Sequence, residues 1–90
     1  MNKTDRAAIA KLIDQINLLN GQIEDVKSAV EDLQGSEREK FDNLSENLQQ
    51  GERGQAIEAA ANYLQEAFAQ LDQSFGAMED AVSYLENASE

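Results

Sequence analysis

The chain has 90 residues, a net charge of -11, and no proline, cysteine or histidine. Without histidine and cysteine it lacks the commonest general base, thiolate chemistry, disulfides and the usual nitrogen and sulfur metal ligands. The negative charge disfavours direct binding to nucleic acid or to anionic membranes, and no apolar run approaches the ~18 residues of a membrane span. We therefore expect a non-enzymatic cytoplasmic protein with no cofactor or bound metal.

The absence of proline, together with only five glycines, favours long uninterrupted helices. We expect a single all-α domain over residues 1–90. It should contain a helix over about 4–42, a corner over 43–52 and a second helix over about 53–88. Thr4 suits the N-cap of the first helix, and Asp5 suits the positive end of its dipole.

Each predicted helix carries an apolar stripe with alternating steps of three and four residues. The first stripe consists of Ile9, Leu12, Ile16, Leu19, Ile23, Val26, Val30 and Leu33. The second consists of Ile57, Ala61, Leu64, Phe68, Leu71, Phe75, Met78, Val82 and Leu85. Such stripes predict the seam of an antiparallel helical hairpin. A lone hairpin leaves one side of each stripe exposed, so we expect a homodimer that forms a four-helix bundle; an extended parallel coiled coil is the alternative.

Charge is distributed unevenly along the chain, because every basic residue lies at or before Arg53. The second helix therefore presents an acidic face made of Glu58, Glu66, Asp72, Glu79, Asp80 and Glu86. This face is either a solvated surface that keeps the protein dispersed or a surface that meets a basic partner.

The heptad spacing is interrupted between the two stripes, and the interruption predicts a structured corner. Ser45 and Glu46 form a cap and first-turn pair, Leu48 supplies an apolar contact, and Gly51 suits the left-handed position that ends a helix. Residues 45–50 should then form one short helical turn.

Arg53 stands in the first turn of the second helix, where a cation opposes the helix dipole. One interpretation is an ion pair with Asp42 or Glu46, or a hydrogen bond to a backbone carbonyl, that holds the corner. The other is an exposed donor that binds a carboxylate or phosphate of another molecule. The candidate partner-binding residues around the corner are Arg38, Lys40, Phe41, Asn43, Leu44, Glu52 and Arg53.

The run from Glu37 to Gln49, followed by Glu52-Arg53-Gly54, resembles a motif of short, acidic, uncharacterised helical proteins of bacteria, phages and prophages. In that family proline is frequent at the position of Ser45, and serine at the position of Gly51. The resemblance implies an accessory protein of a phage or mobile element, acting in the host cytoplasm. It implies no catalytic residues.

Four functions are compatible with these patterns. The first is a protein-interaction module that inhibits or regulates a host protein, of the anti-defence type. The second is a DNA mimic, in which Asp72, Glu79 and Glu86 imitate backbone phosphates and block a nucleic-acid-binding enzyme. The third is a sponge for a nucleotide-like signal that uses Arg38, Lys40 and Arg53. The fourth is a purely structural oligomerisation module.

Overall fold

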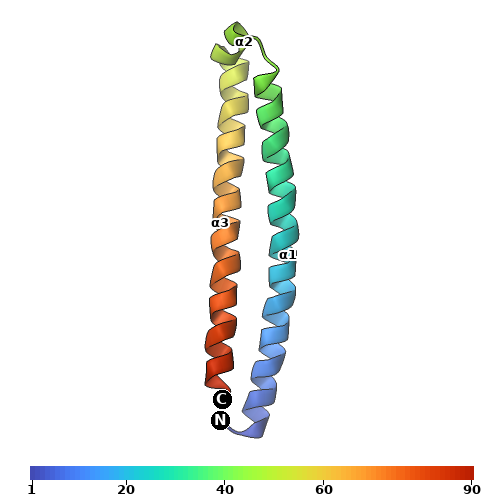
Figure 1. Cartoon of the computed structure of the whole chain (residues 1–90), viewed down its shortest axis with the longest axis vertical. Helices are drawn as coiled ribbons and strands as arrows, with labels where there is room; N and C mark the ends of the chain where they lie inside the picture. Colours follow the sequence, from blue (N-terminus) through green and yellow to red (C-terminus); the bar gives the residue numbers. More distant parts are fainter.

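The computed structural model describes all 90 residues as an antiparallel helical hairpin (Figure 1). Helix α1 spans Lys3–Asp42, the short helix α2 spans Glu46–Gln50, and α3 spans Glu52–Ala88. The two long helices lie side by side, both chain ends meet at one end of the rod, and α2 forms the corner at the other. The molecule measures 68 × 15 × 13 Å. The predicted all-α hairpin is therefore confirmed. Neither long helix contains a stretch apolar enough to cross a membrane.

The start of α1 differs from the prediction because Asn2, and not Thr4, is the N-cap. The Asn2 Oδ1 atom accepts a hydrogen bond of 2.8 Å from the backbone N–H of Asp5. Asparagine is among the best N-capping residues, and its side chain reaches the third helical N–H. The helix consequently begins at Lys3, and Thr4 lies inside its first turn.

The predicted short turn at the corner is α2, with Ser45 as its N-cap residue, although the Ser45 side chain makes no capping hydrogen bond. The prediction that Gly51 adopts a left-handed backbone conformation is wrong. Gly51 is extended, with φ -80° and ψ 179°, because it both ends α2 and serves as the N-cap of α3, which starts at the next residue. An N-cap residue adopts an extended backbone.

The hairpin has almost no closed core. Four of the 90 residues are buried, and among apolar side chains only Ile9 and Ala61 reach that state. The rest of the α3 stripe is half-buried along its whole length, as the sequence pattern predicts. A single pair of helices covers only one side of each apolar stripe, so most of the apolar side chains keep contact with water.

The face of α1 that packs on α3 is only partly the predicted one. Four predicted members of the stripe are buried or half-buried against α3: Ile9, Ile16, Ile23 and Val30. The other four, Leu12, Leu19, Val26 and Leu33, are 47%, 47%, 50% and 57% exposed. In their place a second series with seven-residue spacing turns toward α3, and it consists of Ile13, Asn20, Lys27, Gln34 and Phe41.

Candidate functional site

The corner is held by the side chain of Gln49 and by a close approach of α2 to α3. The Gln49 Nε2 atom donates a 3.0 Å hydrogen bond to the backbone carbonyl of Phe41, in the last turn of α1. Gln55 donates similarly to the carbonyl of Gln50, at 3.2 Å. The Phe41 carbonyl also accepts a 3.1 Å hydrogen bond from the backbone N–H of Leu44. Carbonyls at the ends of α1 and α2 are thus paired within the corner, which is an ordered structure.

The corner motif ends in a glycine, Gly54, because this position has no room for a side chain. This buried residue of α3 lies directly against the last carbonyls of α2. A Cβ atom at Gly54 would stand 2.5 Å from the carbonyl oxygen of Leu48 and would also overlap that of Gln49. No side chain fits here without moving α2, so Gly54 sets the distance between the two helices of the corner.

The basic residues predicted to bind a partner do not converge on one point. Arg38 donates to Asn62 Oδ1 at 3.3 Å and to Gln65 Oε1 at 3.2 Å, which links α1 to α3. Lys40 forms a 2.9 Å ion pair with Glu37. Two of the three basic groups near the corner thus have intramolecular partners.

Arg53 is exposed and makes no ion pair or hydrogen bond. The interpretation that it clasps Asp42, Glu46 or a backbone carbonyl is therefore wrong. Arg53 precedes Gly54 by one residue, and a step of about 100° around the helix turns its side chain away from the contact between α2 and α3.

The remaining predicted corner residues lie in two environments. Phe41 and Leu44 are half-buried, whereas Asn43 and Glu52 are exposed. No hollow of the molecule opens at the corner, so these residues form a convex surface without a binding cleft.

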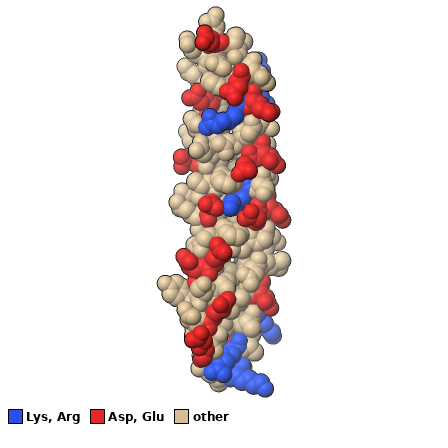
Figure 2. Space-filling model, viewed as in Figure 1, with Lys and Arg blue, Asp and Glu red and all other residues tan.

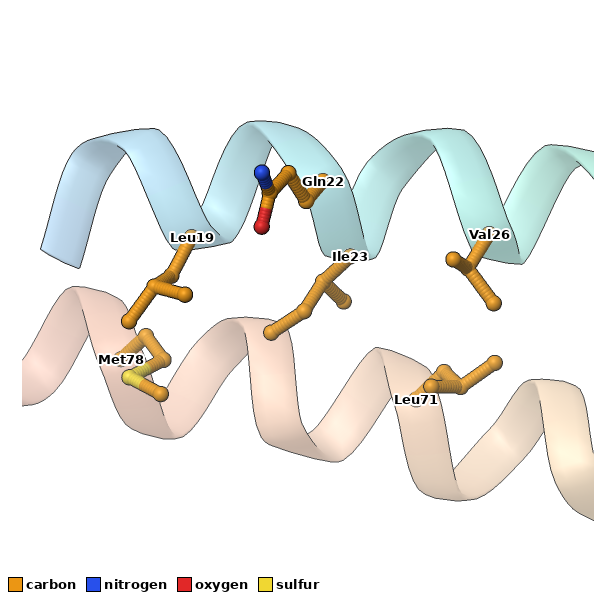
Figure 3. A pocket seen from close by; sticks show the side chains of 6 residues that line it. All are labelled: Leu19, Gln22, Ile23, Val26, Leu71 and Met78. Carbon is orange, nitrogen blue, oxygen red and sulfur yellow. The ribbon is translucent and has the colours of Figure 1, made fainter.

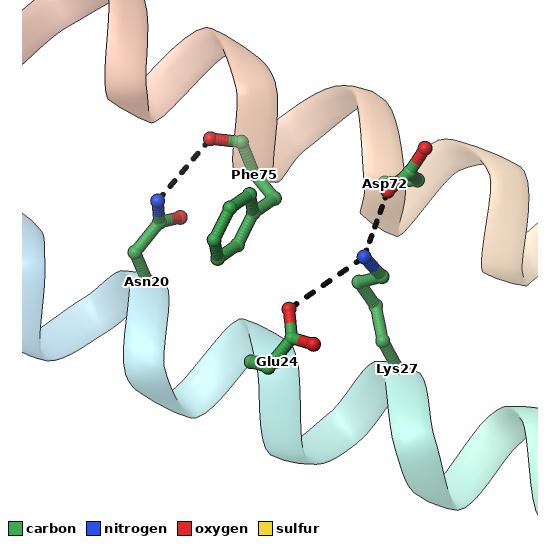
Figure 4. Close-up of polar contacts among 5 residues, drawn as sticks. All are labelled: Asn20, Glu24, Lys27, Asp72 and Phe75. Atoms are coloured by element: carbon green, nitrogen blue, oxygen red, sulfur yellow. Dashed lines mark hydrogen bonds and ion pairs between the residues drawn. The ribbon is translucent and has the colours of Figure 1, made fainter.

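Sequence reasoning missed a polar cluster in the middle of the interhelical seam. Lys27 forms ion pairs of 2.7 Å with Asp72 and 3.6 Å with Glu24 (Figure 4). Its Nζ atom also lies 5.3 Å and 5.2 Å from the ring centroids of Phe68 and Phe75, which is within the range of cation–π attraction. The Lys27 side chain is only 12% exposed, so it crosses the seam and is covered by α3.

The hydrogen bond from Asp72 raises the pKa of the Lys27 amine above its ordinary value of 10.5. Desolvation opposes this shift, and the negative charges of Asp72 and Glu24 add to it. Lys27 is therefore a cation at neutral pH, and it neutralises Asp72 in the middle of the predicted acidic face.

Asn20 lies one heptad before Lys27 and is 7% exposed. Its Nδ2 atom donates to the backbone carbonyl of Phe75 at 3.2 Å, whereas its Oδ1 atom has no protein partner (Figure 4). A single buried amide that finds one backbone partner favours one register of neighbouring helices over others. The clue in the sequence is the polar series Asn20, Lys27 and Gln34 at seven-residue spacing.

The most extensive candidate site is an open apolar groove along the other side of the seam. Its α1 wall is the groove stripe, which we define as Leu12, Leu19, Val26 and Leu33. At its middle lies a hollow of about 210 Å³. The hollow is lined by Leu19, Gln22, Ile23, Val26, Leu71 and Met78. Figure 3 shows that Leu19, Ile23 and Val26 extend from α1 toward Leu71 and Met78 on α3.

The groove is bordered by uncharged residues on both helices. At seven-residue spacing the outer flank of α1 carries Ala8, Gln15, Gln22, Ala29 and Ser36, and that of α3 carries Ala60, Ala67, Ser74 and Ala81. The acidic residues of α3 instead lie on its other side, where Asp72 meets Lys27, or on its outer surface. We call the groove stripe, the hollow and these flanks the groove face.

The surface away from the groove face carries the charge. Figure 2 shows acidic side chains spread over both helices on one face of the rod, with few basic groups among them. No three acidic side chains come together in an arrangement that could hold a metal ion. Comparison of the chain with protein families, curated proteins and solved structures finds no match.

Proposed function

We propose that this chain is a non-enzymatic protein-interaction module that works as a homodimer, with two groove faces covering each other in a four-helix bundle. The observation that carries the proposal is the uncovered groove in a molecule with only two buried apolar residues, Ile9 and Ala61. A domain of this length needs a larger core to fold stably, and a second pair of helices supplies it.

The exposed area supports the dimer. The chain exposes 6590 Å², whereas a compact monomer of 9.9 kDa exposes about 5,200 Å². The difference of about 1,400 Å² lies within the range of about 1,000 to 2,500 Å² that each subunit of an obligate dimer buries.

Charge supports a second copy as the occupant of the groove. With a net charge of -11, two copies repel each other, so a surface through which they associate should itself be free of charge. The groove face meets this condition, because every residue in the stripe and its two flanks is neutral from residue 8 to 36 and from 60 to 81. A basic partner would instead find its complement on the opposite, acidic side.

The surface that stays outside the dimer is where the module would engage a host protein. Arg53 supports the corner as that contact, because its guanidinium is exposed and has no intramolecular partner. Two of the three other hypotheses gain less support. Arg38 and Lys40 are engaged within the chain, which weakens a nucleotide sponge, and Lys27 interrupts the acidic row at Asp72, which weakens a DNA mimic.

Measurement of solution mass tests the dimer. Sedimentation equilibrium should give twice the chain mass of 9.9 kDa for the wild type. Leu19→Asp places a charge in the hollow and should shift the protein to monomer, because burying an unpaired carboxylate is costly. The matched control is Ser28→Asp, since Ser28 is exposed and lies on the side of α1 away from the groove stripe. A wild-type monomer with a cooperative melting transition would contradict the proposal.

A further inference from the structure

We infer that the two copies dock in reverse orientation, with the corner of one over the chain ends of the other and a two-fold axis through the hollow. The inference rests on the proposed dimer and deepens it by naming the contact between the subunits. In the alternative arrangement both corners lie at the same end, and α1 of one copy covers α3 of the other.

The groove stripe is symmetric about the hollow. Reversal of α1 against α1 pairs Leu12 with Leu33 and Leu19 with Val26, about a centre between Gln22 and Ile23. That centre is the middle of the hollow, whose α1 wall runs from Leu19 to Val26. A two-fold axis at this point gives every residue of the stripe an apolar partner.

The apolar positions of α3 have the same two-fold symmetry, and its centre lies at the same point along the rod. Reversal pairs Leu71 with Met78 and Leu64 with Leu85, about a centre between residues 74 and 75. The hydrogen bond from Asn20 to the carbonyl of Phe75 places this part of α3 beside residue 20 of α1, and Leu71 and Met78 line the same hollow. One axis therefore satisfies both helices.

Charges at the two ends of the stripe favour reversal over the alternative. The seven-residue series of the stripe continues to Asp5 at one end and to Lys40 at the other. Reversal sets Asp5 of each copy opposite Lys40 of the second copy, where the amine that already pairs with Glu37 of its own chain also attracts the Asp5 carboxylate. The alternative brings Lys40 to the first turn of the second copy's α3, where Arg53 and Glu52 stand side by side and offer no net attraction.

The chain has no cysteine, so single-cysteine variants can measure the orientation. Asn47 is exposed on α2 at the tip of the corner. A spin label at Asn47→Cys should give an interlabel distance close to the 68 Å length of the rod. The alternative predicts a distance on the scale of the hairpin's 15 Å width. A short distance would overturn the reversed orientation and leave the dimer intact, whereas a monomer in sedimentation would overturn both proposals.

Two further variants check the contact itself. Gln22→Cys lies beside the proposed axis and should join into a covalent dimer with a short bifunctional thiol reagent, whereas the control Ser28→Cys, on the far side of α1, should not. Lys40→Asp should weaken the dimer about fivefold, and the exchange Asp5→Lys with Lys40→Asp should restore it. Failure of the exchange to restore binding, or efficient crosslinking at Ser28→Cys, would contradict the reversed contact.

Discussion

Gly54 is the glycine of this chain at which an added side chain has no room, because α2 carbonyls occupy the space that a Cβ would need. We predict that Gly54→Ala lowers the free energy of unfolding by about 1 to 3 kcal/mol, the usual cost of overpacking. Gly35→Ala is the matched control, since nothing lies near its Cβ position, and it should raise stability by up to about 1 kcal/mol through helix propensity. Urea denaturation followed by circular dichroism measures both, and a stabilising Gly54→Ala would show that α2 does not pack as described.

Alanine substitutions at Arg53 and Gln49 distinguish a residue that contacts a partner from one that stabilises the corner. Arg53→Ala should change the free energy of unfolding by no more than about 0.5 kcal/mol, because the side chain has no partner within the chain. Gln49→Ala should cost about 1 kcal/mol, because it removes the hydrogen bond to the carbonyl of Phe41. Loss of host-protein capture with unchanged melting in Arg53→Ala would support the corner as a contact surface. A large loss of stability would count against it.

Lys27 makes the stability of the hairpin sensitive to alkaline pH. Because its folded pKa lies above the ordinary 10.5, its contribution is complete below pH 10.5 and is lost as the pH rises through the folded value. The melting temperature of Lys27→Met should therefore fall less between neutral pH and pH 11 than that of the wild type. Both proteins keep Tyr63 and Tyr84, so the difference between the two pH profiles isolates Lys27. Parallel profiles would mean that Asp72 does not hold the amine in solution.

At the scale of the element, the sequence predicts the helices better than it predicts which face of α1 meets α3. The end of α1 at Asp42 and the whole apolar stripe of α3 follow from spacing and from the lack of breakers. In α1 the series Ile9, Ile16, Ile23 and Val30 has an apolar neighbour three residues on in every case. Four residues on, the last three members have a polar neighbour, which is Asn20, Lys27 or Gln34. Hydrophobicity alone predicts that the apolar neighbours face α3, and for the hairpin this prediction is wrong.

The preference for the polar neighbour comes from contacts that no single helix contains. Asn20 needs the carbonyl of Phe75, and Lys27 needs Asp72 and the two rings, so their value depends on residues more than forty positions away. The groove stripe is consequently left for another helix. The polar series and the apolar stripe have different partners: the first pairs α1 with α3 within one chain, and under our proposal the second pairs one chain with another.

At the scale of the whole molecule, the response of the dimer to salt distinguishes contact through the neutral groove face from contact through the acidic surface. Each copy carries a net charge of -11, so assembly brings two strongly negative rods together. Salt screens this repulsion with a Debye length of about 10 Å at 0.1 M and about 3 Å at 1 M. Because the two groove faces are uncharged, salt screens little attraction between the copies. The only attractive charge pairs that it weakens are those between Asp5 and Lys40 at the ends of the stripe. We therefore predict that the dimer dissociation constant falls several-fold between about 0.05 M and 0.5 M sodium chloride.

Sedimentation at both salt concentrations measures this dissociation constant, with Leu19→Asp as a variant that should stay monomeric in each. A dimer that weakens as salt is added would mean that charged residues, and not the groove face, hold the two copies together.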